Sequence, residues 1–269
     1  MSLLLIDKPA GPTSHAVVAT IKRTLGADKV GHLGTLDPFA SGLLPIMIGN
    51  TARLSDEAMD GKKGYLFTIG FGRETDTLDP TGRVIAETEL PSAEAVARVD
   101  SYLANFRGPI EQVPPVYSAL KLNGMPLYEY MRGTGQLPID IETKRRTVTI
   151  HSLELVDCNL EQLTLRVVCS KGTYVRSLAR DIAKAMGTVG TCIQLRREMV
   201  EPWHVHDALP LSLGDDGRIS APEKQLLVSR LLPAWSVAAN LPRGKISPEL
   251  ETKLLSGNPL VLNSADVVW

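Results

Sequence analysis

A glycine-rich loop between two apolar runs, from Gly31 to Gly42, holds the residues best suited to chemistry. It contains three glycines, one carboxylate at Asp37 and one imidazole at His32. Glycine tolerates positive φ and a close approach of the backbone, so such a loop can present a side chain into a cleft. Pro38 restricts Asp37 to extended conformations. The carboxylate could act as a nucleophile, or it could only cap a turn, as aspartate before proline often does.

Metal chemistry is not indicated elsewhere in the chain. His204 and His206 form an H-x-H pair, but no third ligand stands at a fitting distance, so the pair is predicted to be superficial or structural. His32 is a lone histidine, and such residues are more often structural than catalytic. The three cysteines are odd in number and lack a CxxC spacing, which indicates a reducing cytoplasm rather than a disulfide framework or a zinc site. We therefore predict no metal in a cytoplasmic protein.

The elements that must position the loop follow from apolar spacing. Leu3–Ile6 and Leu43–Ile48 are typical of buried strands, and Tyr65–Phe71 alternates as a strand does. Thr13 can cap a helix that Gly26 would close. Two further helices are predicted at Ala93–Phe106 and Tyr174–Met186, and two further strands at Thr147–Leu155 and Leu163–Cys169. The irregular alternation favours an α+β fold with a mixed or antiparallel sheet.

Composition is that of a soluble globular protein, with 269 residues, 43% hydrophobic and 22% charged. No run approaches the roughly 18 apolar residues that a membrane span requires. The net charge of −1 is a mild objection to nucleic-acid binding. However, residues 171–197 contain six basic side chains and only one acidic one, so a basic face remains possible on a near-neutral protein.

Four blocks of sequence carry a family resemblance. In chain order they are GHLGTLDPFASGLLPIMIG, KGYLFTIGFGRETDT, VPPVYSALKLNGMPLYEY and KGTYVRSLARDI. Together they closely resemble the TruB family of bacterial tRNA pseudouridine-55 synthases. The resemblance runs from Leu4 to about Arg197, roughly three-quarters of the chain. Four ordered blocks are far less likely to agree by chance than one short motif.

The resemblance implies a role for three residues in the reaction. Asp37 matches the catalytic aspartate of the family, and Arg176 matches the arginine that pairs with it. Tyr65 matches an active-site tyrosine that would stack on the target uracil and whose hydroxyl could move a proton. The residues alone favour a core role for Tyr65, because aromatic side chains on an alternating strand face are usually part of the core. Whether Asp37 attacks C1′ or the base, and which group accepts the C5 proton, stay open.

The resemblance also implies substrate contacts. His32 would contact the RNA near the extruded nucleotide and support the base stack from which the target base has been removed. Tyr174 and Leu195 would line the pocket that receives this base. Each of these could otherwise be an ordinary packing residue. A set of basic side chains is expected to contact RNA phosphates. Alternatively, these side chains only form a solvated face of the protein. That set is Lys144, Arg145, Arg146, Arg180, Arg196 and Arg197.

The implied protein is a cytoplasmic monomer that needs no cofactor and binds the T-arm stem-loop of tRNA. Residues 1–230 would form a pseudouridine synthase domain, a central mixed or antiparallel sheet flanked by helices. A mobile RNA-contacting insertion is expected at about residues 114–142. Residues 231–269 resemble only the beginning of a PUA domain, a small β-structured RNA-binding module, and are expected to dock on the main body.

Two alternatives remain at this stage. The chain could be a non-catalytic tRNA-binding or folding chaperone that uses the same cleft without turnover. It could also be a synthase of the same family with another RNA target. The presence of Asp37, Tyr65 and Arg176 together favours the enzyme, because a pure binder has no need of the whole set.

Overall fold

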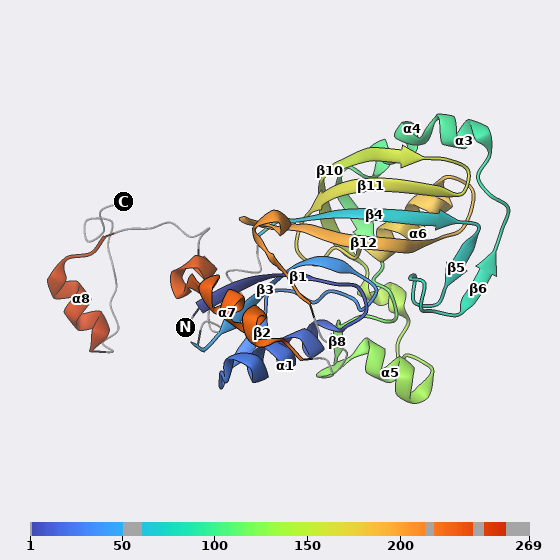
Figure 1. Ribbon diagram of the computed structural model, residues 1–269. Helices are drawn as coiled ribbons and strands as arrows, with labels where there is room; N and C mark the ends of the chain where they lie inside the picture. Colours follow the sequence, from blue (N-terminus) through green and yellow to red (C-terminus); the bar gives the residue numbers. More distant parts are fainter. Residues whose placement is uncertain (1, 51–60, 213–217, 239–244, 257–269) are drawn as a thin grey trace.

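The fold is built on one large mixed sheet, whose strands lie side by side across the centre of Figure 1. The computed structural model describes residues 2–50, 61–212, 218–238 and 245–256. Within these, eleven strands form the sheet, most of them antiparallel; β12 runs parallel to β3, and β14 parallel to β1. The main path is β14 (Leu209–Pro210), β1 (Ser2–Lys8), β3 (Ser41–Ile48), β12 (Gly190–Val200), β4 (Lys63–Phe71), β11 (Gln162–Cys169), β10 (Arg146–Cys158) and β7 (Gly108–Gln112). Off this path, β13 (Trp203–His204) pairs with β12, β15 (Leu232–Pro233) with β1, and β2 (Val30–His32) with β3.

Helices and small hairpins surround the sheet (Figure 1). The longest helices are α1 (Ser14–Leu25), which contacts β2, and α6 (Val175–Ala185), which packs on β12 and β4. The other helices are α3 (Ala93–Ala97), α4 (Val99–Leu103), α5 (Leu127–Thr134), α7 (Ala221–Ser229) and α8 (Pro248–Leu255). Short 3₁₀ turns occur at Ala104–Phe106, Ile141–Lys144, Val205–Asp207 and Ala234–Ala238. The hairpins are β5–β6 (Arg73–Thr75, Val84–Glu87) and β8–β9 (Lys121–Leu122, Met125–Pro126).

Local signals in the sequence explain the elements next to the loop from Gly31 to Gly42, named the catalytic loop below for the role that the family resemblance implies for Asp37. The Thr13 side chain accepts a hydrogen bond from the backbone N–H of Ala16 and caps α1, and Gly26 ends the helix at φ 64°. In β4 the alternate residues Phe67 and Ile69 are fully buried, as period-two alternation predicts. The five predicted strands and the two long helices therefore form where the apolar spacing places them, whereas β7 and β12 were not predicted.

The predicted helix at Ala93–Phe106 is wrong in one respect, because it is broken at Arg98. That residue leaves helical geometry at φ −110° and ψ 18°, and separates α3 from α4. Ala95, Val99 and Leu103 are nevertheless all buried. Apolar spacing reports which face is buried, but it does not report a local break between two turns.

The chain after residue 230 begins as part of the main body. Strand β15 pairs with β1, and Val237 is buried in a small apolar cluster with Leu3, Leu5 and Trp203. The predicted docking of the tail therefore holds for its first residues. Helix α8 follows, and it lies apart from the body in Figure 1. The predicted likeness to the beginning of a PUA domain covers residues 231–269, of which 239–244 and 257–269 lie outside the described residues; the described ones form β15, a 3₁₀ turn and helix α8.

No helix in the described part of the chain is long and apolar enough to cross a membrane.

Gly42 is where the catalytic loop joins the sheet, and it tolerates no side chain. It adopts φ +107°, and a Cβ there would lie 2.3 Å from the carbonyl oxygen of Arg197 on the parallel strand β12. We expect Gly42→Ala to be destabilised, because the obstructing atoms belong to the backbone and the strands must separate. Gly11→Ala is the matched control: Gly11 has φ +111° but nothing within 4 Å of the added Cβ.

Urea unfolding measures this difference. Gly11→Ala should lose about 1–2 kcal/mol for its backbone conformation alone. Gly42→Ala should lose about 2–3 kcal/mol more, since overpacking adds to the same backbone cost. Equal losses for the two variants would mean that the strand contact does not require glycine.

Candidate active site

The catalytic loop is held by three buried polar side chains from three different elements. Lys8, at the end of β1, donates from Nζ to the carbonyls of Pro9 (2.8 Å), Pro12 (2.9 Å) and Pro38 (3.4 Å). Burial lowers the pKa of Lys8 to about 8, and the Asp37 carboxylate opposes that shift. These bonds tie the residue after Asp37 to the start of the chain.

Ser14 and Arg197 hold the loop from the other side. The Ser14 hydroxyl, at the start of α1, donates to the Leu36 carbonyl at 2.9 Å and accepts from the Leu36 N–H at 2.8 Å. Arg197, in β12, is 1% exposed and donates to the carbonyls of Leu43 (2.8 Å), Gly34 (3.0 Å) and Thr35 (3.4 Å). The loop that carries Asp37 is therefore rigidly supported by side chains distant in sequence.

Asp37 forms a bidentate ion pair with Arg176, the second residue of α6. The Arg176 Nε lies 2.8 Å from Oδ2 of Asp37, and Nη2 lies 3.2 Å from Oδ1. The arginine side chain is 4% exposed, whereas that of Asp37 is 32% exposed. A planar guanidinium fork fixes the orientation of a carboxylate as well as its charge. One face of the carboxylate thus remains open to a reactant while the other is held.

The remaining donors of Arg176 are also used. Nη1 donates to the Thr77 carbonyl, and Nη2 donates to the Tyr117 carbonyl at 3.0 Å. A second carboxylate, Asp79, lies with Oδ2 3.7 Å from Nη1 and is itself buried. Oδ1 of Asp79 accepts from Thr77 and Thr81 in its own turn. Arg176 therefore joins the catalytic loop, the turn after β5 and the segment before β8.

A pocket of about 120 Å³ opens beside this ion pair. Its lining includes Asp37 and Arg176, the ring-bearing residues Tyr65 and Tyr174, and the apolar side chain of Leu195. Tyr65 lies on β4 and Leu195 on the neighbouring β12. Leu195 pairs with Phe67, which is two residues from Tyr65 along β4. The pocket also takes in residues from the segment before β8.

Tyr174 is placed in the pocket by a buried amide. The Gln112 side chain accepts from the Tyr174 N–H at 2.7 Å and donates to its carbonyl at 3.0 Å. Gln112 is 1% exposed, at the end of β7. The Arg146 guanidinium lies over the Tyr174 ring, 4.9 Å from its centroid. Both the backbone and the ring of Tyr174 are therefore restrained.

The electrostatics of the pocket bear on what its groups can do. Burial raises the pKa of the Asp37 carboxyl above its ordinary value, the Arg176 guanidinium opposes that shift, and the Asp79 carboxylate adds to it. Burial likewise raises the pKa of Tyr65, against the effect of Arg197, so its phenol keeps its proton at neutral pH. A held carboxylate beside a protonated phenol and an apolar wall can attack an electrophilic carbon of a planar ring placed between them.

Comparison with known proteins identifies the family. A family model described as TruB family pseudouridylate synthase, N-terminal domain, matches residues 22–175. A protein named tRNA pseudouridine synthase B from Aromatoleum aromaticum is 42% identical over 258 residues, which cover 96% of this chain and 80% of that protein. A protein of the same name from Burkholderia mallei is 42% identical over 261 residues, covering 97% and 83%. The chain belongs to the TruB family.

Solved structures agree with this membership at the level of the fold. A chain in the solved structure of an H/ACA ribonucleoprotein bound to a substrate RNA containing 2′-deoxyuridine has a TM-score of 0.67 at 24% identity, covering 96% of this chain and 67% of that one. A chain of a Cbf5–Nop10–Gar1 complex has a TM-score of 0.69 at 25% identity, covering 95% and 67%. The predicted α+β pseudouridine synthase fold with a mixed central sheet is confirmed.

The structure brings together five of the residues predicted for the TruB-family site. Asp37, Tyr65, Tyr174, Arg176 and Leu195 all line the pocket of about 120 Å³. His32 does not line it. Its half-buried ring lies on β2 with Nδ1 buried and unbonded among the described residues, and burial lowers its pKa.

The structure contradicts the predicted phosphate contact for Arg197. Its guanidinium is buried and is occupied by three carbonyls, so it is a support for the loop rather than a surface cation. Its neighbour Arg196 points to the other side, where it pairs with Asp7 at 2.6 Å and is 38% exposed. Adjacent residues of a strand face opposite sides, so only one of two consecutive arginines could have met an outer surface.

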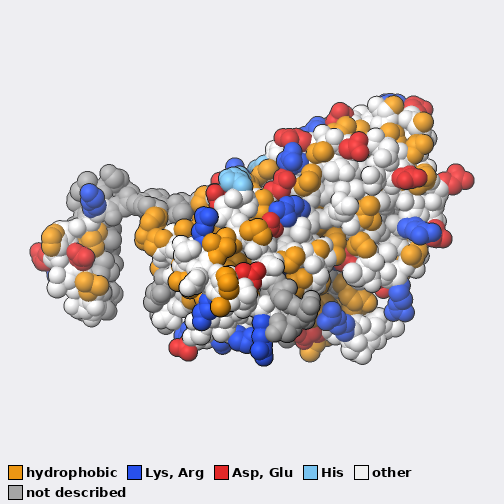
Figure 2. Space-filling view, viewed as in Figure 1, with side chains coloured by type: hydrophobic (Ala, Val, Ile, Leu, Met, Phe, Trp, Pro, Cys, Tyr) orange, Lys and Arg blue, Asp and Glu red, His pale blue; other side chains and the backbone are white. Residues whose placement is uncertain are grey.

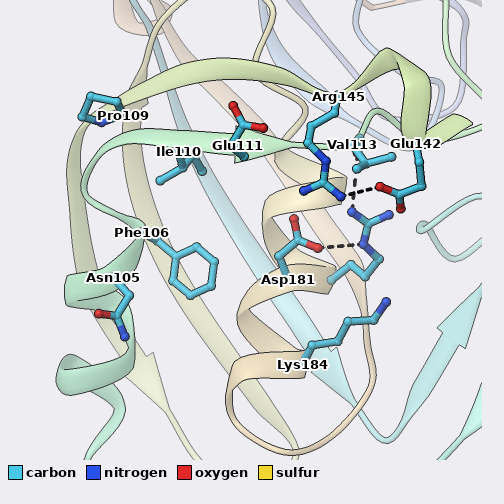
Figure 3. A pocket seen from close by; sticks show the side chains of 11 residues that line it. Asn105, Phe106, Pro109, Ile110, Glu111, Val113, Glu142, Arg145, Asp181 and Lys184 are labelled. Carbon is cyan, nitrogen blue, oxygen red and sulfur yellow. Dashed lines mark hydrogen bonds and ion pairs between the residues drawn. The ribbon is translucent and has the colours of Figure 1, made fainter.

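Other basic residues of the predicted set surround a second pocket, of about 480 Å³ (Figure 3). Arg145 pairs there with Glu142, and Arg180 pairs with Asp181 at 2.8 Å. Lys184 also lines this pocket, as do the apolar side chains of Phe106 and Ile110 (Figure 3). This second pocket contains none of Asp37, Tyr65 and Arg176. Lys144, half-buried, is not among its lining residues.

The histidine pair behaves as the sequence predicts. His204 and His206 are exposed, and their rings stack 5.3 Å apart. Among the described residues, no three His, Cys, Asp or Glu side chains are grouped as a metal site would require.

Sequence reasoning missed Lys8 and Asp79 in this TruB-family site. Lys8 follows an apolar strand directly, where a charged residue that stays buried must have partners. Asp79 lies two residues beyond the second resembling block and carries no signal of its own, because its role depends on contact with Arg176. The burial of Lys8 and the contact of Asp79 with Arg176 both depend on the fold, so neither role could be read from the sequence.

The pair of carboxylates around Arg176 predicts a pH effect. If turnover needs ionised Asp37, the rate falls as pH drops through a pKa that burial has raised. Asp79→Asn removes a like charge, lowers the pKa of Asp37, and should move the acid limb of kcat/KM to lower pH. Asp76→Asn is the control, because Asp76 lies in the same turn but accepts from the Arg83 N–H at 2.9 Å instead. A shift to higher pH for Asp79→Asn would mean that Asp79 acts mainly by holding Arg176.

Proposed function

We propose that this TruB-family protein isomerises uridine to pseudouridine in tRNA, at position 55 of the T-loop, with Asp37 as the nucleophile. The observation that carries the proposal is the bidentate Asp37–Arg176 pair at the wall of a pocket that also contains Tyr65. The names of its relatives, tRNA pseudouridine synthase B, support tRNA as the substrate. The geometry supports an attacking carboxylate that is oriented before the substrate arrives.

The chemistry can be assigned to groups in the pocket. The reaction breaks the bond between C1′ and N1, joins C1′ to C5, and transfers the C5 proton to solvent while N1 takes up a proton. The Asp37 carboxylate can form a transient covalent bond either to C1′ or to the base. Arg176 keeps it ionised and aligned, and the protonated Tyr65 hydroxyl is a candidate to relay the C5 proton.

The target base must leave its stack to reach this pocket. Extrusion costs a few kcal/mol, which contacts in the pocket have to offset. The rings of Tyr65 and Tyr174 and the side chain of Leu195 supply flat and apolar surface for that purpose. The insertion at 114–142, which contains β8, β9 and α5, projects from the lower right of the body in Figure 1 and is suited to closing over an RNA stem-loop.

Affinity for the RNA backbone is proposed to come from basic side chains outside the pocket. Arg146, Arg180 and Arg196 are partly exposed, and Arg145 is exposed. In Figure 2, basic side chains gather along the lower border, near α1, while acidic ones are commoner on the upper part. This separation allows attraction of phosphates despite a net charge of −1.

Tritium release tests the proposed reaction. A T-arm stem-loop with tritium at C5 of its uridines should release tritium to water on incubation with the protein, and the product should contain pseudouridine at position 55 only. Binding without any release would instead favour a tRNA chaperone that uses the same cleft. Release from another position would indicate a TruB-family enzyme with a different RNA target.

The protein is proposed to act as a monomer, because no coiled-coil or other interface pattern stands out in its sequence. Light scattering at the concentration of the activity assay tests this, and a dimer mass would contradict it.

A further inference from the structure

Ser118 is a second polar group in the wall of the active-site pocket. It lies in the segment between β7 and β8, at the root of the insertion, and lines the pocket together with Asp37 and Tyr65. It is 3% exposed. None of the roles assigned so far to the loop, the ion pair or the aromatic residues involves its hydroxyl.

The Ser118 hydroxyl is buried without a hydrogen-bond partner among the described residues. Comparable hydroxyls nearby are satisfied: Ser177 donates to the Val113 carbonyl at 2.8 Å, and Thr173, in the same pocket, donates to the Ser170 carbonyl at 3.0 Å. A buried polar group left unpaired costs about 1–3 kcal/mol, so its retention calls for an explanation.

The backbone around Ser118 is held on both sides, so the hydroxyl can change position only by rotation about its own Cα–Cβ bond. The Tyr117 carbonyl accepts from Nη2 of Arg176 at 3.0 Å. The Ser118 carbonyl accepts from the N–H of Tyr128, in the first turn of α5, at 3.1 Å. The same arginine that orients Asp37 therefore also fixes the residue next to Ser118, and both side chains face one small pocket.

We propose that the Ser118 hydroxyl hydrogen-bonds the polar edge of the uracil that enters the pocket beside Asp37. The inference rests on the proposed function and names a base-binding residue for it. A serine hydroxyl can donate to a carbonyl and can accept from an N–H, and uracil offers both along the edge formed by O2, N3–H and O4. The pairing would satisfy the hydroxyl only when the base is bound.

The symmetry of uracil allows the same hydroxyl to bind this edge both before and after the base rotates. Isomerisation exchanges N1 for C5 as the atom bonded to C1′, which requires the ring to turn about the axis through N3 and C6. That rotation exchanges O2 with O4 and leaves N3–H on the axis. One hydroxyl at this edge therefore meets the same arrangement of carbonyl and N–H groups before and after the rotation, and it can hold the detached base near the sugar.

Ser118→Ala tests the assignment, with Thr173→Val as the matched control. Thr173 contributes a hydroxyl to the same pocket, but that hydroxyl already has a protein acceptor. Three quantities are measured for each variant: tritium release at saturating stem-loop, affinity for a stem-loop with an abasic riboside at the target position, and thermal unfolding of the free protein.

We expect Ser118→Ala to slow release about tenfold, the effect of losing one hydrogen bond to a buried group. Affinity for the abasic stem-loop should be unchanged, because no base is present to contact the hydroxyl. The unfolding temperature should stay the same or rise, since the variant removes an unpaired buried hydroxyl. Thr173→Val should not reproduce this combination: if it slows release, it should also lower the unfolding temperature.

Three outcomes would overturn the assignment. Release within about twofold of wild type would mean that the hydroxyl makes no bond to the base. An equal loss of affinity for the abasic stem-loop would assign it to the RNA backbone or to pocket shape. A lower unfolding temperature would mean that it has a partner in the free protein. If wild type itself released no tritium, the proposed function would fail first, and this assignment with it.

Discussion

Asp37→Asn is expected to lower the rate of pseudouridine formation by at least about a thousandfold, because a carboxamide is a poor nucleophile. Catalytic residues act together, so loss of the nucleophile removes most of the effect of the whole group. The amide oxygen of asparagine can still accept from Arg176, so the geometry of the loop should survive. Single-turnover tritium release from the T-arm stem-loop measures the loss. Equal release by both proteins, or by neither, would remove Asp37 from the role of nucleophile.

Binding separates a chemical role of Asp37 from an architectural one. Affinity of Asp37→Asn for the stem-loop should stay within about tenfold of wild type, because phosphate contacts dominate affinity for RNA. Asp37→Glu provides a second comparison, since it keeps the carboxylate but displaces it. A displacement near 1 Å can cost about a hundredfold in rate. A large loss of RNA affinity in either variant would mean that the loop mainly shapes the binding surface.

Arg176→Ala is expected to reduce turnover by roughly a hundredfold or more, since an oriented ionic partner of the reacting group is lost. The substitution leaves the Thr77 and Tyr117 carbonyls without their donor and places two carboxylates, Asp37 and Asp79, together without the shared cation. The pKa of Asp37 should therefore rise further, and the acid limb of kcat/KM should move to higher pH. This shift is opposite in sign to that expected for Asp79→Asn.

Arg180→Ala is the matched control for Arg176→Ala. Arg180 lies one turn further along α6, lines the second pocket, and is partly exposed beside Asp181. Its removal should weaken binding and reduce its salt dependence with little change in the saturated rate. Arg176, at 4% exposure, is not accessible to a phosphate. If Arg176→Ala impaired only binding, the ion pair would have no part in the reaction.

Short-range features of this protein were predictable from the chain. The cap at Thr13, the glycine that ends α1 and the alternation in β4 depend on residues within a few positions of one another, and the structure has them where the sequence predicts. The family membership was predictable for another reason, because it rests on residue identity in ordered blocks. The α+β fold with a mixed or antiparallel sheet was predicted from the irregular alternation of strands and helices, and the family resemblance implies the same fold.

Contacts between distant segments were decided only by the tertiary structure. Asp37 and Arg176 are 139 positions apart, and nothing local states that they meet, nor that Asp79 shares the arginine. Arg196 and Arg197 are consecutive arginines that the sequence alone does not distinguish. Arg196 is partly exposed and Arg197 supports the loop, because adjacent side chains of a strand point to opposite sides of the sheet.

For the loop that carries Asp37, the sequence by itself determined the residue types, the permissive glycines and the likeness to a family. The tertiary structure decided what surrounds them: a buried lysine and arginine that hold the loop, a raised pKa for Asp37, and a serine hydroxyl without a partner. Whether a side chain is buried or paired depends on the residues packed around it, which come from many parts of the chain. For that reason they follow from the fold and cannot be read from any one segment.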